Sequence, residues 1–369
     1  MRDRRVALVA GSPPDGAFCG VVDYTVCLAR ALTARGVEAT VVGGTDWGAA
    51  ALPGLRARIA ALAPDIVHLQ YPATAFGSGF APHLLAALPL AGATRVVTLH
   101  EFSQGHALRK ASSGAFSLAA GPFGPRALVF TTAGERAAYL ARHPWARRRS
   151  RVVPVGSNIP FGPWSPARAD GVPRIVHFGQ IRPNKGLEAV IALARAAAAA
   201  GRPWRFEIVG SAPARFADYA RARRAETEAA GLPIDWIEGA DTETVARRLR
   251  AADAAYLPFP DGASWRRGSL VAALGNGCPV VSTRGDQTPE DLGAAVAFAE
   301  GETEALAALD RLIADADAAG RASRAATAAA APCSWDAIAA AHRTLYDALP
   351  RRGRPAAATA PAGGAAPGG

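Results

Sequence analysis

The sequence predicts an α/β fold made of two doubly wound parallel-sheet domains that face one another. Strand-like and helix-like segments alternate along almost the whole 369-residue chain. The strand-like segments are continuous apolar runs, which are typical of parallel strands buried on both faces. A stretch rich in proline and glycine, residues 156–173, separates two halves that repeat this order, as expected of a linker between two domains.

The first half predicts six strands, at residues 6–10, 37–42, 66–70, 95–99, 128–131 and 151–155. Helices are expected between them, including residues 21–35 and 133–142. Strand, helix, strand order builds parallel βαβ units. We therefore expect a Rossmann-like N-terminal domain over residues 1–160 and a linker over residues 161–173.

The second half predicts strands at residues 174–178, 204–209, 234–238, 254–258, 280–283 and 295–298, with helices that include 186–200 and 242–251. A second Rossmann-like domain is expected over residues 174–332. An amphipathic helix follows at residues 334–349 with Ser334 as its N-cap. The Ala-, Pro- and Gly-rich residues 351–369 are expected to be disordered. Ligands on such sheets bind at the carboxyl ends of the strands, which predicts a cleft between the domains.

Composition restricts the partners. The net charge of +10 favours anionic partners. Arginine runs at 147–149 with 151, and at 221 with 223 and 224, are either a patch for an anionic membrane or solvated faces. No aromatic-interleaved basic motif or zinc-ligand spacing supports nucleic-acid binding. Cys19, Cys27, Cys278 and Cys333 fit no disulfide or metal framework. No apolar run reaches the length of a membrane span, so a cytoplasmic location is expected, with the inner membrane face as an option.

The strongest chemical signal is the loop at residues 179–186, which follows a strand and opens a helix. It carries Lys185, one of two lysines in the chain, and Arg182. A compact ammonium holds a crowded phosphate as a point charge, which a flat guanidinium does not replace. Two cations and a helix N-terminus beside Gly179 suit a diphosphate. The alternative is that Lys185 is a solvated residue at a helix start.

Three further segments end at the expected cleft. The loop at residues 261–270 brings an acid, two arginines and a helix N-terminus to a strand end, at Asp261, Ser264, Arg266, Arg267, Ser269 and Leu270. A glycine-bearing loop reaches a helix start at Gly20, without the GxGxxG pattern of dinucleotide sites. His100 and Glu101 follow the fourth strand. His68 lies inside a strand and is expected to be a buried, hydrogen-bonded histidine.

Over residues 4–350 the chain resembles the GT-B nucleotide-sugar glycosyltransferases, specifically the retaining family four. The resemblance is carried by DIVHLQ, TLHE, VVPVGSNI, FGQIRPNKGLE, FEIVGS and GNGCPVVST in this order. It implies that Arg182 and Lys185 grip a donor diphosphate near Gly20, and that His100 touches the transferred sugar. It also implies that Gly210 and residues 237–239, including Gly239, border the base, and that residues 333–350 pack back on the first domain.

The sequence departs from this family at one place. Two glutamates eight positions apart are typical, and they fall here on Ser264 and Ala272. The resemblance implies a leaving diphosphate that itself accepts the acceptor proton, so no protein nucleophile and no metal is required. We expect transfer of a hexose-type sugar from a nucleotide-diphosphate donor to a sugar or lipid-linked acceptor, in cell-surface polysaccharide or glycolipid assembly. The alternatives are a nonhydrolysing sugar-nucleotide 2-epimerase, which needs paired acids in the cleft, and a non-catalytic scaffold.

Overall fold

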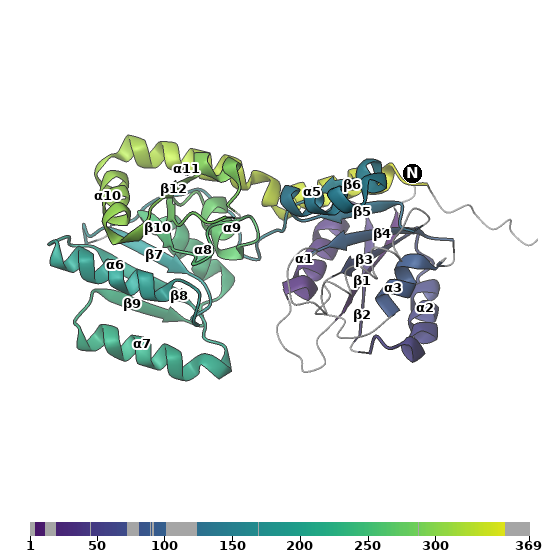
Figure 1. The fold of residues 1–369 in the computed structure, drawn as a ribbon, viewed down its shortest axis with the longest axis horizontal. Helices are drawn as coiled ribbons and strands as arrows, with labels where there is room; N and C mark the ends of the chain where they lie inside the picture. Colours follow the sequence, from purple (N-terminus) through teal and green to yellow (C-terminus); the bar gives the residue numbers. More distant parts are fainter. Residues whose placement is uncertain are drawn as a thin grey trace, which may run out of the picture.

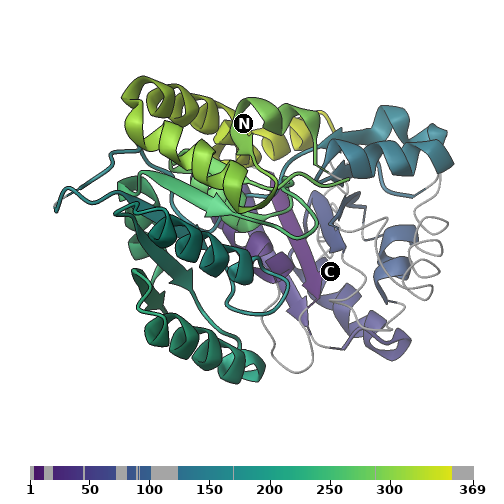
Figure 2. The ribbon, with the colours of Figure 1, turned by 60° about the vertical axis from the view of Figure 1, so that its left-hand side comes forward.

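The structure is a computed structural model of the chain. It describes residues 4–11, 20–44, 46–71, 81–88, 90, 92–100, 124–168, 170–286 and 288–350. These residues form two α/β domains, each built on a six-stranded parallel sheet. Figure 1 shows the domains beside one another, and Figure 2 brings the C-terminal domain to the front. The predicted fold class, GT-B, is confirmed.

The N-terminal sheet has the strand order β2-β1-β3-β4-β5-β6. Its strands are β1 (Arg5–Gly11), β2 (Glu38–Gly44), β3 (Ile66–Tyr71), β4 (Thr94–Leu99), β5 (Ala127–Phe130) and β6 (Ser150–Val152). Its helices are α1 (Gly20–Ala34), α2 (Leu52–Ala61), α3 (Ala81–Ala87) and α5 (Ala133–Arg142), with short 3-10 turns η1 (Ala49–Ala51) and η2 (Pro144–Arg149). The predicted strands are confirmed, although β6 ends three residues earlier than expected.

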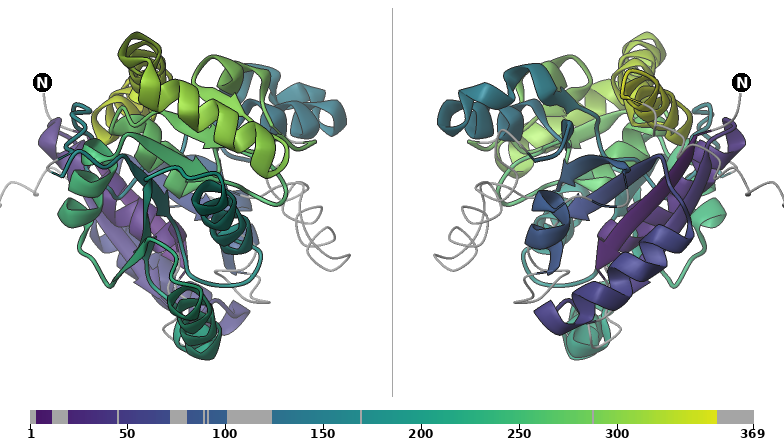
Figure 3. Two further views of the ribbon diagram at one scale, coloured as in Figure 1. Left: turned by 90° about the vertical axis from the view of Figure 1, so that its left-hand side faces the viewer. Right: turned by 90° about the vertical axis from the view of Figure 1, so that its right-hand side faces the viewer.

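The C-terminal sheet has the order β12-β11-β10-β7-β8-β9. Its strands are β7 (Arg174–Phe178), β8 (Arg205–Gly210), β9 (Ile234–Glu238), β10 (Ala254–Leu257), β11 (Val280–Ser282) and β12 (Val296–Phe298). Its helices are α6 (Leu187–Ala199), α7 (Ala217–Ala229), α8 (Thr242–Ala251), α9 (Gly268–Gly275), α10 (Gly301–Ala314) and α11 (Ala316–Ala330), with 3-10 turns η3 (Ala214–Phe216), η4 (Glu290–Ala294) and η5 (Ala331–Cys333). Figure 3 shows the two domains end on.

Apolar side chains on both faces of each sheet explain why the strands read as continuous hydrophobic runs. All six residues of β3 are buried. In the N-terminal domain one face packs against α1 and the last helix, through residues such as Leu28 and Ile338. The other face packs against α2, α3 and α5, through residues such as Leu55, Leu85 and Tyr139. This double cover is the arrangement that parallel strands require.

The segment between the sheets, residues 153–173, has no regular helix or strand where it is described. Its first residues, Val153 and Val155, belong to the N-terminal core. Its later part packs on the C-terminal domain, because the Trp164 indole donates to the Ala252 carbonyl at 2.7 Å and Arg168 pairs with the buried Asp253 at 2.6 Å. The segment therefore passes from one domain to the other.

The last helix, α12 (Trp335–Asp347), begins at Ser334, whose hydroxyl accepts from the Ala337 N–H at 3.2 Å. It leaves the C-terminal domain and packs on α1 of the N-terminal domain, as the yellow end of the ribbon in Figure 1 shows. The Arg4 guanidinium donates to the Leu349 carbonyl at 2.7 Å. The chain thus crosses between the domains twice.

A buried polar cluster fixes α12 to the sheet. The Tyr346 hydroxyl lies 2.6 Å from Nδ1 of His68, and Nε2 of His68 lies 2.7 Å from the Thr98 hydroxyl. The prediction that His68 is a buried, hydrogen-bonded histidine is confirmed. His342 packs beside it and its Nδ1 lies 2.9 Å from the Ile338 carbonyl. Burial lowers the pKa of His342 to about 4, and burial also lowers the pKa of His68 well below its usual value.

These buried imidazoles predict a loss of stability in mild acid. A histidine in the unfolded chain has a pKa near 6.5. In the folded protein the pKa of His342 is about 4. Between these two pH values the unfolded chain binds a proton at this histidine and the folded protein does not. Each such histidine should lower the free energy of unfolding by up to about 1.4 kcal/mol per pH unit in this window. We expect His342→Asn to show a smaller difference in urea stability between pH 7 and pH 5 than the parent. An equal difference would contradict the assignment.

Candidate functional site

A cavity of about 810 Å³ lies between the two domains, at the carboxyl ends of both sheets. Its lining comes from α1, from the segment after β6, and from the ends of β7, β8, β9 and β10 with the loops and helices that follow them. The lining residues are Gly20, Tyr24, Val155, Gly156, Ser157, Asn158, Ile159, His177, Phe178, Gly179, Gln180, Lys185, Gly210, Ser211, Ala212, Pro213, Ala240, Thr242, Val245, Phe259, Arg266, Arg267, Gly268 and Ser269. Strand ends of parallel sheets are where such folds bind ligands.

The loop between β7 and α6 reaches this cavity through tight backbone turns. Asn184 and Gly186 both have positive φ angles, of 61° and 81°. A side chain on Gly186 would collide with the carbonyl oxygen of Pro258 at the end of β10. Likewise, a side chain on Gly210 would collide with the Gly179 carbonyl. The close approach of these backbones leaves Lys185 directed at the cavity.

Lys185 lies among positive charges. Burial lowers its pKa, and the Arg182 and Arg267 guanidinium groups lower it further, while Asp261 acts in the opposite direction. Repulsion between like charges disfavours the protonated ammonium. An anion bound beside Lys185 would remove this repulsion, so the site is suited to a ligand that carries negative charge.

The loop after β10 supplies two arginines. Arg267 forms an ion pair with Asp261, and its guanidinium lies 5.1 Å from the centre of the Phe259 ring. It directly precedes α9, whose first residues Gly268 and Ser269 line the cavity and whose N-terminus has no side-chain cap. Uncapped N–H groups and the helix dipole favour an anion at this end.

Arg266 connects the two domains. Its guanidinium lies 3.8 Å from a carboxylate oxygen of Glu135, which is buried at the start of α5. The other carboxylate oxygen of Glu135 accepts from the Thr131 hydroxyl at 3.0 Å. A C-terminal arginine at the cavity wall is thereby held by an N-terminal carboxylate.

Of the residues that the sequence assigns to the site, seven line the cavity: Gly20, Gly179, Lys185, Gly210, Arg266, Arg267 and Ser269. Six do not: His100, Arg182, Gly239, Asp261, Ser264 and Leu270. The Nε of Arg182 donates to the Gln180 side chain at 3.0 Å, and its guanidinium acts on Lys185. Leu270, in α9, is buried in the core of the C-terminal domain. Glu101 lies outside the described residues.

His100 lies one layer behind the cavity wall. Its ring packs edge-on against Tyr24, with ring centres 4.9 Å apart, and Tyr24 is the residue that lines the cavity. Its Nε2 donates to the Gln70 side-chain oxygen at 2.9 Å, and burial lowers its pKa to about 3. His100 is therefore a neutral donor beside Tyr24, and its contact with the transferred sugar stays a prediction.

Part of the chain matches a known protein-family model. Residues 172–315 match the model described as "Glycosyl transferases group 1". This range runs from the start of β7 to the end of α10 and includes the loops that carry Lys185 and Arg267. The C-terminal domain, which contains this match, is termed the group 1 domain. No curated protein sequence matches the chain.

Solved structures resemble the whole chain. HepE from Anabaena, solved with UDP and glucose, superposes with a TM-score of 0.66 at 16% identity, over 94% of this chain and 100% of HepE. Sucrose-phosphate synthase from Thermosynechococcus elongatus gives 0.64 at 16% identity, over 93% and 98%. WaaG, a glycosyltransferase of lipopolysaccharide biosynthesis, gives 0.59 at 14% identity, over 93% and 100%. At these identities the likeness shows the shared two-domain fold.

The group 1 domain also contributes residues that the sequence did not single out. His177, at the end of β7, is buried, and its Nδ1–H donates to the Tyr256 carbonyl at 3.1 Å. Burial lowers its pKa to about 4, so its neutral Nε2 is an acceptor close to Gly179. Phe178 and Phe259 add apolar surface. The strand-end position that drew attention to His100 applies equally to His177 and could have identified it.

The C-terminal domain has no carboxylate at the two positions where the resemblance to family four implies glutamates. Ser264 precedes α9, and Ala272 is fully buried within it. No described residue that lines the cavity is acidic. In the part of the chain that the structure describes, no group of three His, Cys, Asp or Glu side chains could hold a metal ion.

The described helices include none with the length and apolarity needed to cross a membrane.

The loop geometry predicts unequal effects for two glycine substitutions. Gly186→Ala should lower the free energy of unfolding by about 3 kcal/mol, because positive φ and a steric collision combine. Gly201→Ala is the matched control, since Gly201 also has a positive φ but has no atom within 4 Å of an added side chain. We expect about 1 kcal/mol there. Urea unfolding measures both, and equal losses would show that the collision with Pro258 is absent.

Proposed function

We propose that the protein is a glycosyltransferase that moves a hexose from a nucleotide-diphosphate sugar to an acceptor with retention of configuration. The observation that carries the proposal is the interdomain cavity, where Lys185, Arg266 and Arg267 meet the N-terminus of α9 with no lining carboxylate. The group 1 domain supplies this wall. HepE, of the same fold, contains UDP and glucose in its structure, and a nucleotide sugar has the charge that this cavity would accept.

In the proposed reaction the diphosphate lies against Lys185, Arg267 and the first N–H groups of α9. The bond between the sugar C1 and the phosphate oxygen breaks while C1 bonds to the acceptor oxygen on the same face. The departing phosphate oxygen takes the proton of the acceptor hydroxyl, so no protein base is needed. The main task of the protein is then to stabilise the negative charge on the leaving diphosphate. Arg182 is proposed to add its positive charge from its position beside Lys185.

We propose that the nucleoside lies toward the loops after β8 and β9. Gly210, Ala240 and Thr242 line that side of the cavity, and Gly239 permits the turn between them with a φ of 69°. Because Ala272 is a buried apolar residue, the ribose contact cannot come from a carboxylate at this position. Asp261, through its ion pair with Arg267, positions a cation rather than touching the sugar.

Two residues of the N-terminal wall are proposed to orient the transferred sugar. Tyr24 borders the cavity, and His100 supports it from behind through the edge-on ring contact. The acceptor is proposed to be a sugar or lipid-linked sugar of cell-surface polysaccharide or glycolipid assembly, at the cytoplasmic face of the membrane. The exposed arginines of η2 supply a positive surface for that location.

Lys185 provides the sharpest test. Lys185→Ala should lower the rate of transfer or donor hydrolysis by about 100-fold or more, because a cation on the leaving group is lost. Lys185→Arg should not restore it, since the crowded site needs a compact charge. Arg321→Ala, on the exposed face of α11, removes the same charge far from the cavity and should leave turnover unchanged. A Lys185→Ala enzyme that turns over normally would remove this residue from the reaction.

Metal removal gives an independent test. Lysine, two arginines and a helix N-terminus already neutralise the diphosphate in the proposed site, so added EDTA should leave turnover unchanged within about twofold. Inhibition by EDTA that Mg²⁺ reverses would show that the cations are insufficient.

A panel of sugar nucleotides with calorimetry and product analysis separates the remaining functions. Transfer to an acceptor is expected. Binding without turnover would favour a non-catalytic scaffold, for which the substitution of both family glutamates by Ser264 and Ala272 is the supporting observation. Interconversion of the donor without acceptor would indicate a 2-epimerase, although no described lining residue supplies the acids that it needs.

A further inference from the structure

A second cavity, of about 480 Å³, lies at the opposite edge of the N-terminal sheet. Its walls include Thr94 at the start of β4, Arg126 just before β5 and Arg149 at the end of η2. The interdomain cavity adjoins the carboxyl ends of the same sheet. A strand rises about 3.3 Å per residue, so the six residues of β4 span about 20 Å between the two edges. The two cavities share no lining residue.

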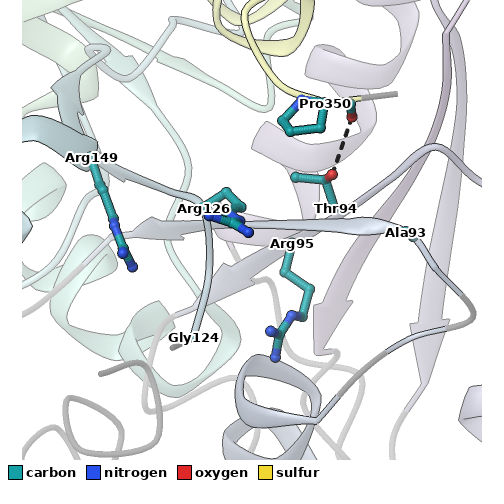
Figure 4. A pocket seen from close by; sticks show the side chains of 7 residues that line it. All are labelled: Ala93, Thr94, Arg95, Gly124, Arg126, Arg149 and Pro350. Atoms are coloured by element: carbon teal, nitrogen blue, oxygen red, sulfur yellow. Dashed lines mark hydrogen bonds between the residues drawn. The ribbon is translucent and has the colours of Figure 1, made fainter. Parts of the chain in front are cut away.

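Three arginines line this second cavity. Figure 4 shows Arg95, Arg126 and Arg149 on three separate segments, with their guanidinium groups pointing in different directions. Arg95 and Arg126 are direct neighbours on adjacent parallel strands, because the Arg126 N–H donates to the Arg95 carbonyl at 2.9 Å. Residues paired in this way place their side chains on the same face of a sheet. No described residue that lines the cavity carries a negative charge.

One of the three arginines is fixed in place. Nη1 of Arg95 donates to the carbonyls of Ala86 and Leu88, at 2.7 Å and 3.1 Å, at the carboxyl end of α3. Burial and the Arg126 guanidinium lower the pKa of Arg95, which agrees with a positive potential at the cavity. Arg126 is exposed and approaches this fixed charge without a carboxylate in the lining.

We propose that this cavity binds the phosphate group of a phosphate ester. Arginine binds phosphate through paired N–H donors, and several arginines around one space satisfy a doubly charged group. The volume is within the range of small-molecule sites, so it accommodates a substituent beyond the phosphate. The ester is either the headgroup of a membrane lipid or a soluble phosphorylated compound, because both present the same group to the three arginines.

Glycerol 3-phosphate is the probe, titrated calorimetrically into the full-length protein. We expect a binding site that persists in the Lys185→Ala variant and is weakened about tenfold or more by Arg126→Ala combined with Arg149→Ala. Arg147→Ala combined with Arg148→Ala is the matched control, since it removes two charges from exposed positions of η2 outside the cavity. Binding to this control, and to Lys185→Ala in the interdomain cavity, should stay within about twofold of the parent.

No binding to the parent protein would overturn the proposal, and so would equal weakening in the two double variants, which would indicate a diffuse charge effect. Loss of binding in Lys185→Ala alone would move the phosphate to the interdomain cavity. If the alanine pair proves unstable in thermal unfolding, Arg126→Lys with Arg149→Lys keeps both charges but loses the paired donors, and it should still bind more weakly.

Sedimentation with phosphatidylcholine vesicles, with and without phosphatidylglycerol, identifies the source of the ester. The site is assigned to a lipid headgroup if sedimentation requires phosphatidylglycerol, is lost when the two cavity arginines are replaced, and is inhibited by glycerol 3-phosphate. Calorimetric binding of glycerol 3-phosphate without vesicle sedimentation assigns it to a soluble ester. Both results support the phosphate site and differ only in the molecule that carries the phosphate.

Discussion

Concentrated positive charge at the interdomain cavity is the constraint on which the rest of the site depends. Lys185 is surrounded by Arg182 and Arg267, and the resulting repulsion is opposed within the protein mainly by Asp261. Such an arrangement opposes folding unless packing elsewhere holds the charges in place. The buried cores on both faces of the C-terminal sheet provide that packing. The tight turns at Asn184 and Gly186 then hold the ammonium at the cavity.

The two domains contribute differently to the cavity. The C-terminal domain supplies the cations and the helix N-terminus, whereas the N-terminal domain supplies Gly20 and the aromatic ring of Tyr24. The ion pair from Arg266 to the buried Glu135 links these contributions. A buried carboxylate with an arginine partner in the opposite domain favours the closed arrangement, because separation would leave the carboxylate without that partner.

Much of the fold could be predicted from the sequence, because parallel strands buried on both faces are continuously apolar, as in β3, β5 and β10. The edge strand β9, which has no buried residue, was identifiable by its place in the alternation of strands and helices. The loop containing Lys185 was also identifiable, since a rare residue type stood at a strand-to-helix junction. The depth of His100 was not, because it depends on Tyr24 of α1 covering it, a contact between segments far apart in the sequence. The same limitation applies to Arg182, whose side chain is oriented by its hydrogen bond to Gln180. It also applies to the second cavity, because its arginines become neighbours only through the register of the strands.

The two crossings between the domains are joined to each other. The Trp335 indole, at the start of α12, donates to the Ser157 carbonyl at 2.8 Å, and a side chain on Gly156 would overlap the Trp335 ring. Ser157 and Gly156 also line the interdomain cavity. Two connections fastened at one point make that point the place where we expect a hinge between the domains. In a rotation about it, the cavity residues beside the hinge would move least and the far rims of the two domains would move most.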